Sequence, residues 1–211
     1  MRNTKFTTRF VMILIVMLFT LFPVSSQQGR SADDKLLDIL DITEGMVVAD
    51  VGAGNGKFSF KMAELVGPNG HVYANDIKVN LIDKINSRKE EDGIENLTTI
   101  LSEEEDPALP AQVDLIILKF VYHHLSKPDV FMANMLKYLK PEGRLVIVAV
   151  DITQVSSSRA NNASRDACVS DPDDTVEAIE LNGYSFERKE FIEGSRDVDY
   201  VLFFKAAETG I

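Results

Sequence analysis

Residues 47–56 read VVADVGAGNG, and the fold expected for the whole chain follows from this stretch. The apolar run over residues 46–51 is typical of a buried β-strand, and it leads directly into Gly52, Gly54 and Gly56. Glycines permit positive φ angles and let a ligand approach the backbone closely. We therefore expect a strand that ends in a tight, ligand-binding turn.

Helical and strand-like patterns alternate on both sides of this turn. Helical spacing covers residues 33–40, 57–66, 79–91, 128–139 and 171–181. Further strand-like runs cover residues 71–74, 97–101, 113–119, 144–150, 184–191 and 198–205. Only a short turn joins the last two runs, so they predict an antiparallel hairpin. The alternation predicts a doubly wound α/β sheet that is largely parallel.

One segment interrupts the alternation. Residues 152–171 are rich in Ser, Asn and Arg and poor in apolar residues, which indicates a mobile loop that could act as a lid.

The spacing of the glycines and the acid before them indicate the kind of ligand. The pattern is G-x-G-x-G followed by Lys57, whereas a dinucleotide fingerprint would place its third glycine at position 57. Asp50 precedes the turn; its charge would repel a pyrophosphate but attract the ammonium and sulfonium of S-adenosylmethionine (SAM), by about 1.5–3 kcal/mol if hydrogen-bonded. This hypothesis requires the Asp50 carboxylate to face the crevice above the turn.

A second acid follows the next strand. Asp76 stands where a carboxylate can accept both hydroxyls of a ribose, a feature that NAD and SAM proteins share. Ile77 beside it could pack on an adenine face. The alternative readings are a helix cap for Asp76 and a core side chain for Ile77.

Three stretches together resemble class I SAM-dependent methyltransferases of a bacterial type that carries a signal peptide and a Tyr-His-His signature. They are VADVGAGNGKFSFKMAELVGPNGHVYANDI (residues 48–77), LPAQVDLIILKFVYHHL (109–125) and LKPEGRLVIVAVD (139–151). The resemblance spans residues 33–205. It implies a Rossmann-like sheet of seven strands with the last strand antiparallel.

The resemblance also implies roles for single residues. Asp50, Gly52, Gly54 and Gly56 would contact the methionine part of SAM, and Asp76 the ribose. A carboxylate from Glu103, Glu104 or Glu105, with Glu103 as our first choice, would meet the adenine amino group. Lys119 departs from the family, whose members often carry a small polar or acidic residue there.

Tyr122, His123 and His124 follow the fourth strand of the sheet, at the rim where a methyl acceptor would lie. A neutral imidazole could take a proton from a hydroxyl or amine acceptor, and Tyr122 could form a wall of the acceptor pocket. The alternatives are that the histidines pack or cap backbone carbonyls and that Tyr122 belongs to the core. Convergence of three metal ligands is not expected, because His71 is the only other histidine.

Charge and cysteine content exclude several classes of function. The formal net charge of −11 disfavours nucleic acid as a partner. Cys168 is the only cysteine, so neither an internal disulfide nor a thiolate metal cluster is possible. A small-molecule acceptor is the expected partner.

The first residues are predicted to be a targeting segment. Arg2, Lys5 and Arg9 precede an apolar run over residues 10–22, and small residues follow Pro23. This run is shorter than the roughly 20 residues of a membrane span. We expect residues 1–26 to be a signal peptide, or else an uncleaved anchor and the only membrane contact, and residues 27–211 to be an exported methyltransferase domain.

Two alternatives to methyl transfer stay open at this point. One is a non-catalytic SAM- or nucleoside-binding protein on the same fold. The other is a nicotinamide-dependent oxidoreductase, which the missing third glycine disfavours.

Overall fold

The computed structural model describes residues 30–151, 169–193 and 198–208. The pattern of internal contacts separates residues 1–30 from a compact unit over Ser31–Ile211. The predicted targeting segment, Cys168 and nearly all of the predicted loop at 152–171 therefore lie outside the described residues. Among those that are described, no helix has the length and apolar character needed to cross a bilayer.

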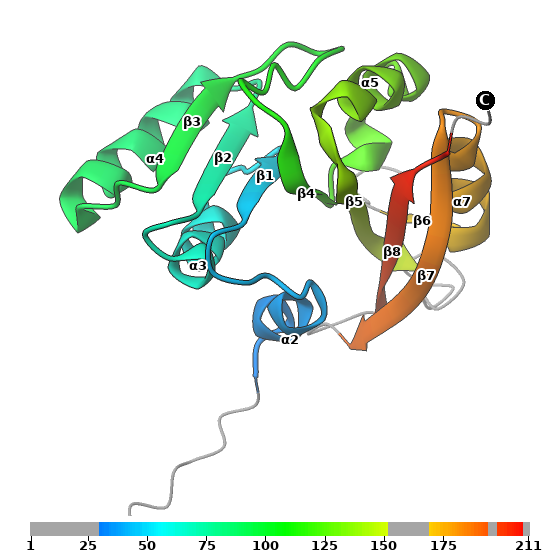
Figure 1. Ribbon diagram of the computed structural model, residues 1–211, viewed down its shortest axis with the longest axis horizontal. Coiled ribbons are helices and arrows are strands. Elements are labelled where there is room, and N and C mark those ends of the chain that lie inside the picture. Colours follow the sequence, from blue (N-terminus) through cyan, green and yellow to red (C-terminus); the bar gives the residue numbers. More distant parts are fainter. Residues whose placement is uncertain (1–29, 152–168, 194–197, 209–211) are drawn as a thin grey trace, which may run out of the picture. The chain divides into compact units, whose positions relative to one another are not determined.

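One mixed sheet forms the centre of the unit (Figure 1). Its order is β3-β2-β1-β4-β5-β8-β7, and every neighbouring pair is parallel except the two pairs that include β8. The strands are β1 (Val47–Val51), β2 (His71–Asp76), β3 (Leu97–Leu101), β4 (Val113–Lys119), β5 (Leu139–Asp151), β7 (Tyr184–Glu193) and β8 (Val198–Ala206). The predicted seven-stranded sheet with a final antiparallel strand is confirmed. A two-residue strand, β6 (Val169–Ser170), adds to β5 and was not expected.

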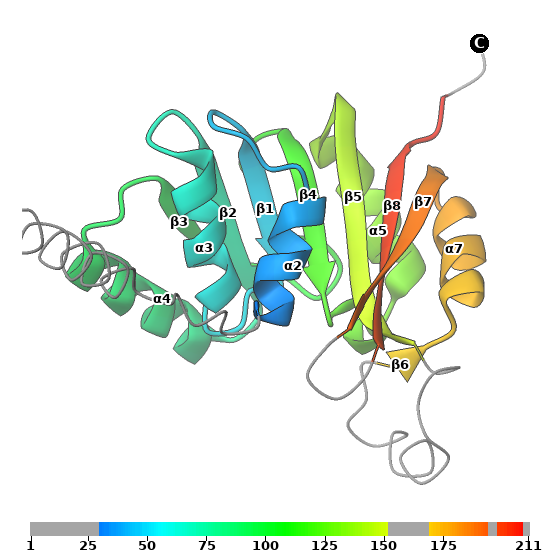
Figure 2. The ribbon, with the colours of Figure 1, turned by 90° about the horizontal axis from the view of Figure 1, so that it is seen from below.

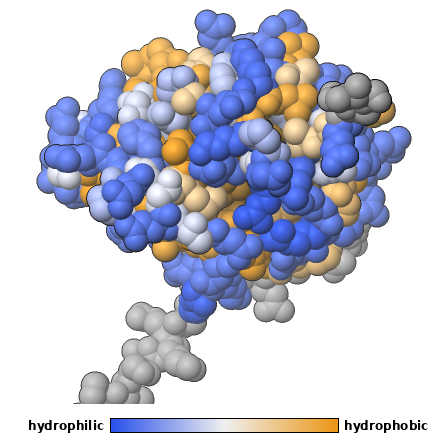
Figure 3. All heavy atoms as spheres, viewed as in Figure 1, coloured by the Kyte–Doolittle hydropathy of each residue, from blue (hydrophilic) through white to orange (hydrophobic). Residues whose placement is uncertain are grey.

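Helices cover both faces of the sheet (Figure 2). One face carries α2 (Ala32–Ile39), α3 (Lys57–Val66) and α4 (Val79–Asp92), and the other carries α5 (Pro128–Met135) and α7 (Pro172–Glu180). Leu36, Met62 and Ile85 bury the first group in one core, whereas Met132 and Ile179 bury the second group in another. The doubly wound arrangement follows from this double burial of the central strands. Seen from one side, the surface is mainly hydrophilic, with hydrophobic side chains scattered across it (Figure 3).

Side-chain caps begin two of the described helices, α2 and α7. Ser31 begins α2 with a capping box, in which its hydroxyl accepts from the Asp34 N–H while the Asp34 carboxylate accepts from the Ser31 N–H. Asp171 caps α7 in the same position.

The predicted helix over residues 128–139 is wrong at its end. α5 stops at Met135, a 3-10 turn η2 (Leu136–Tyr138) follows, and β5 begins at Leu139 instead of residue 144. Leu139 pairs with Val113 of β4, and the amide of Gln112 donates to the carbonyls of Lys137 and Leu139. These tertiary hydrogen bonds draw the segment into the sheet against its helical pattern.

Candidate active site

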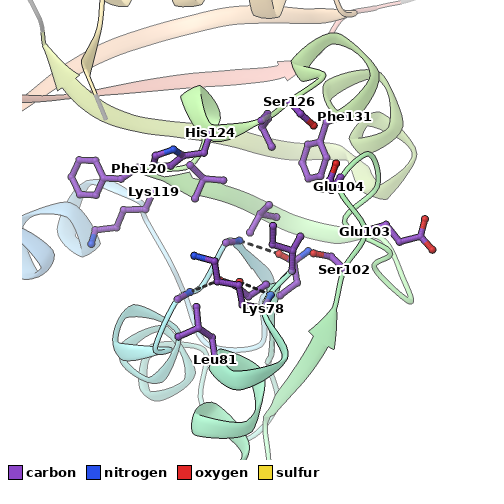
Figure 4. Close-up of a pocket in the computed structure, with 18 residues that line it drawn as sticks. Lys78, Leu81, Ser102, Glu103, Glu104, Lys119, Phe120, His124, Ser126 and Phe131 are labelled. Carbon is purple, nitrogen blue, oxygen red and sulfur yellow. Dashed lines mark hydrogen bonds between the residues drawn. The ribbon is translucent and has the colours of Figure 1, made fainter. Parts of the chain in front are cut away.

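A cavity of about 500 Å³ opens where the carboxyl ends of β1, β2 and β4 meet (Figure 4). Parallel strands bring their carboxyl ends to one edge, and ligands of doubly wound sheets bind there. The turn after β1 and the loop after β2 line one side of this cavity, and the 3-10 turn η1 (Tyr122–His124) with the start of α5 lines the other. The size suits a small ligand, since such pockets measure roughly 300–1,000 Å³.

The glycine turn has the backbone that the sequence predicts. Gly52, Gly54 and Gly56 have φ angles of 73°, 59° and 75°. The N–H of Gly52 donates to Asn75 Oδ1 at 3.0 Å, and that of Gly54 donates to Asp76 Oδ2 at 3.0 Å. Gly52 and Gly54 line the cavity and Gly56 does not. The second strand therefore fixes the shape of the turn.

Asp76 combines the two readings that the sequence left open. Its carboxylate lines the cavity, yet one oxygen accepts from Gly54 and the other accepts the N–H of Lys78, the residue before α4, at 2.9 Å. Asn75 was not predicted: it is buried and bridges the Gly52 N–H to the carbonyl of Pro107. Contact of Asp76 with a ribose stays a prediction.

The expectation that Asp50 faces the crevice is wrong. Asp50 is 2% exposed and does not line the cavity; the Ser59 hydroxyl of α3 donates to its carboxylate at 2.5 Å. Burial raises the pKa of Asp50 to about 6, against the opposing effects of Ser59 and Lys119. Alternation along β1 explains this, because Asp50 shares the strand face of Val48, which packs in the core under α3. The Asp50 carboxylate therefore binds Ser59 of α3 and not a ligand in the cavity.

Lys119 lines the cavity, but its ammonium is held at the side. Nζ lies 2.9 Å from Asp33 Oδ1 in α2, and 5.1 Å from the ring centroids of both Phe58 and Phe120. Figure 4 shows the side chain extending toward α2 and away from the cavity centre. Burial alone would raise the pKa of Asp33, but the hydrogen bond and charge of Lys119, together with the charges of Lys57 and Lys61, outweigh burial and lower it. The carboxylate of Asp33 in α2 therefore balances the positive charge of Lys119.

The residues predicted to contact adenine are Ile77 and one of Glu103, Glu104 and Glu105, and they lie at the exposed part of the site. Ile77 lines the cavity and is 53% exposed, so it is not a core side chain. Glu103 and Glu104 also line the cavity, and Figure 4 shows the Glu103 side chain pointing outward. Glu105 forms an ion pair with Lys127 instead. Which carboxylate would meet an adenine stays a prediction.

The Tyr-His-His turn separates into three environments. His124 lines the cavity; His123 and Tyr122 do not. Both ring nitrogens of His123 are buried without a hydrogen-bond partner among the described residues, and burial with the adjacent His124 lowers the pKa of His123 to about 4. Burial raises the pKa of Tyr122, whose ring packs against the core. Contact of His124 with an acceptor stays a prediction.

An apolar wall beside His124 was missed in the sequence. Phe120, Val121, Leu125 and Phe131 also line the cavity. Phe120 has a φ angle of 60°, an unusual value for a bulky residue, and its N–H donates to the carbonyl of Val148 in β5. The run of apolar residues after β4 was the signal, but a buried strand end has the same composition. Within the described residues no group of three metal-ligating side chains forms a metal site.

Known proteins with similar sequences are methyltransferases. Residues 42–194 match the model of a family described as a methyltransferase domain. The chain is 30% identical over 117 residues to nocamycin O-methyltransferase of Saccharothrix syringae, covering 55% of this chain and 42% of that protein. It is 35% identical over 116 residues to a protein-L-isoaspartate O-methyltransferase of Methanothrix thermoacetophila, covering 53% and 51%. The chain thus spans about half the length of these curated relatives.

Solved structures share the fold. A SAM-dependent methyltransferase from Aquifex aeolicus superposes with a TM-score of 0.71 at 24% identity, covering 83% of this chain and 89% of that one. A magnesium protoporphyrin IX methyltransferase from Synechocystis with bound S-adenosylhomocysteine (SAH) has a TM-score of 0.61 at 16% identity, covering 83% and 80%.

Proposed function

This chain belongs to the methyltransferase domain family. On that premise we propose that it is a SAM-dependent methyltransferase, and that it methylates a small apolar molecule at a hydroxyl group held beside His124. The observation that carries the proposal is a single cavity in which a side-chain-poor glycine turn faces an apolar wall with one imidazole. Such a cavity can hold a donor at one end and a weakly acidic acceptor at the other.

The donor end suits an adenosyl group. A Cβ added at Gly54 would meet no atom within 4 Å, so the turn leaves open space above its backbone. Gly52 and Gly54 would contact the methionine part of SAM, Asp76 the ribose and Ile77 the adenine. Bound SAM supplies an electrophilic methyl group on a sulfonium, and the carboxylates of Asp76, Glu103 and Glu104 make this region favourable for a cation.

The acceptor end can orient a substrate and hold a proton. Phe120, Leu125 and Phe131 exclude water, which favours an apolar acceptor. As the acceptor oxygen forms its bond to the methyl carbon and the carbon–sulfur bond breaks, the hydroxyl proton would pass to a nitrogen of His124. The relative named nocamycin O-methyltransferase is consistent with a small-molecule acceptor, whereas the isoaspartate enzyme acts on protein.

The decisive measurement follows SAH formation with a panel of phenols, hydroxyquinones and aliphatic alcohols, alongside calorimetric titration with SAM and SAH. We expect both cofactors to bind and apolar phenols to be methylated at oxygen. Binding without turnover across the panel would favour the alternative, a non-catalytic SAM-binding protein. Methylation confined to peptides or nucleic acid would contradict the small-molecule proposal.

We also propose that residues 1–26 direct export of the domain. The support is compositional: three cations precede an apolar run that ends in small residues. Expression of the full chain in a bacterial host, followed by cell fractionation and N-terminal sequencing, tests this. Cleavage after residue 26 is expected, an intact membrane-bound chain would indicate an anchor, and cytoplasmic retention would contradict export.

A further inference from the structure

β3 lies at one edge of the sheet and, in the part of the chain that the structure describes, pairs only with β2. The hydrogen bonds around it show which peptide groups are used. The N–H of Val72 donates to the carbonyl of Asn96, and the N–H of Ser102 donates to the carbonyl of Asp76. Because peptide groups alternate in direction along a strand, the even positions face β2, and Leu97, Thr99 and Leu101 direct their N–H and C=O groups outward.

This outward row has no partner strand among the described residues. Such a row is a template for another strand unless charges, prolines or bulges blunt it. β3 reads LTTIL, with no charged residue and no proline, and its register with β2 shows no bulge.

The opposite edge of the same sheet is blunted. β7 carries charged residues along its length, among them Glu187, Arg188 and Lys189, and its register shifts between Phe186 and Arg188. The two edges therefore differ in the features that prevent strand addition. β3 is the edge that is open to a partner.

Acidic residues stand at both ends of β3. Glu91 and Glu95 are exposed before the strand, and Glu103 and Glu104 are exposed after it. Two cations near the end of α4 offset part of the negative charge before β3. Arg88 forms an ion pair with Asp92, and Lys89 lies in the last turn of the helix. Charge complementarity disfavours a second copy of this acidic chain, since its own β3 would bring acids against acids.

We propose that β3 binds an extended segment of another protein by strand addition, and that this segment has an uncharged, β-branched centre flanked by lysines or arginines. Backbone hydrogen bonds to Leu97, Thr99 and Leu101 supply affinity, and the acids at both ends select a basic partner. Leu97, Thr99 and Leu101 lie outside the cavity lining, whereas Glu103 and Glu104 belong to it. The backbone hydrogen bonds of the proposed strand therefore do not depend on the proposed acceptor.

The probe is a fluorescent peptide of about nine residues, with two lysines at each end and alternating valine and threonine between them. We expect saturable binding by the full chain, measured by anisotropy, and slower hydrogen exchange at the amides of Thr99 and Leu101. Leu101→Pro removes one outward N–H without touching the β2 ladder and should weaken binding at least tenfold; Leu101→Val, which keeps the N–H, should weaken it less than threefold. Melting curves check that both variants are folded.

Charge is tested separately. Glu95→Lys should weaken peptide binding about fivefold at low salt, and the matched change Glu142→Lys, at an exposed position of β5, should not. A peptide with glutamates in place of lysines should not bind. No binding of the basic peptide, equal binding by Leu101→Pro, protection mapped elsewhere, or self-association through β3 would each overturn the proposal.

Discussion

At the scale of single residues, the two adjacent histidines give a sharp test of the proposed chemistry. His124 lines the cavity and His123 does not. We expect His124→Gln to lower kcat by roughly 10²–10⁴-fold, the usual contribution of general acid–base catalysis, with SAH affinity nearly unchanged. Initial rates of SAH formation and calorimetric titration measure the two effects.

His123 is the matched control for that substitution. Its buried nitrogens have no partner among the described residues, so His123→Phe removes unsatisfied polar atoms and should retain stability and most of the activity. A loss of kcat as large in His123→Phe as in His124→Gln would contradict the assignment to His124.

Asp50 makes a pH-dependent contribution to stability. Its folded-state pKa of about 6 lies above the ordinary value of 3.8, so between these values the folded protein holds a proton that the unfolded chain has released. Raising the pH from about 4 to about 7 should therefore lower the free energy of unfolding, relative to Asp50→Asn, on the order of 3 kcal/mol. Urea unfolding of both proteins across this range tests it; parallel curves would contradict the raised pKa.

His124 and Asp50 show which features of the site can be predicted from the sequence and which cannot. The location of His124 follows from chain order, because residues after a central parallel strand emerge at the ligand edge. Charge alone placed Asp50 in the crevice, but the alternation of side chains along β1 decides its direction. The difference between His123 and His124 was not predictable, since it depends on how one 3-10 turn packs.

At the scale of elements, alanine substitutions at Gly52 and Gly54 distinguish the loss of stability caused by the turn's backbone from the loss of ligand affinity. Gly52→Ala would place a Cβ 2.4 Å from Val121 Cγ2 at a φ of 73°, whereas Gly54→Ala meets no atom within 4 Å at a φ of 59°. We expect Gly54→Ala to cost about 1–2 kcal/mol of stability and Gly52→Ala about 1–3 kcal/mol more. Thermal unfolding ranks the two.

Gly54→Ala should affect ligand binding more than its small effect on stability suggests. Because the Cβ of Gly54→Ala enters the open space of the cavity, SAH affinity should fall at least about tenfold in a protein that is still folded. Unchanged SAH affinity in Gly54→Ala would show that the ligand does not lie over this turn.

Asp33 and Asp34 of α2 form three ion pairs, with Lys57 and Lys119 for Asp33 and with Lys61 for Asp34. Two of these pairs differ in exposure. Asp33–Lys119 is mostly shielded, whereas Asp34–Lys61 is more exposed. Double-mutant cycles of unfolding free energy should give a coupling of about 1 kcal/mol or more for the first pair and less for the second. Equal couplings would contradict a specific role for Lys119 in fixing α2.

Element boundaries were predictable where local signals agree with tertiary contacts. Residues 57–66 and 113–119 have the predicted limits, because glycines or a central buried run define them. The start of β5 at Leu139 could not be predicted from local sequence, because it depends on the amide of Gln112 and on pairing with Val113, which are distant in the chain.

At the scale of the whole molecule, charge and topology together narrow the choice of ligand. The chain carries 33 acids and 22 basic residues, and the cavity lining has Asp76, Glu103 and Glu104 against Lys78 and Lys119, of which Lys119 is paired with Asp33. A pyrophosphate would meet this field unfavourably, and the adenosyl donor of the family would not. The net charge follows from composition, but which charged side chains line the cavity required the fold.

Cofactor selectivity should therefore appear in the stability of the folded unit. A ligand that binds only the folded state at one hundred times its Kd adds about 2.7 kcal/mol to the free energy of unfolding. For a chain of 211 residues this corresponds to a rise in Tm of roughly 5–11 °C. We expect SAM and SAH to produce such a rise and NADH to produce none, in thermal melts at equal ligand concentrations. A rise with NADH alone would mean that the glycine turn accepts a pyrophosphate despite the surrounding carboxylates, whereas a rise with SAH that Gly54→Ala abolishes would place the adenosyl donor at the turn.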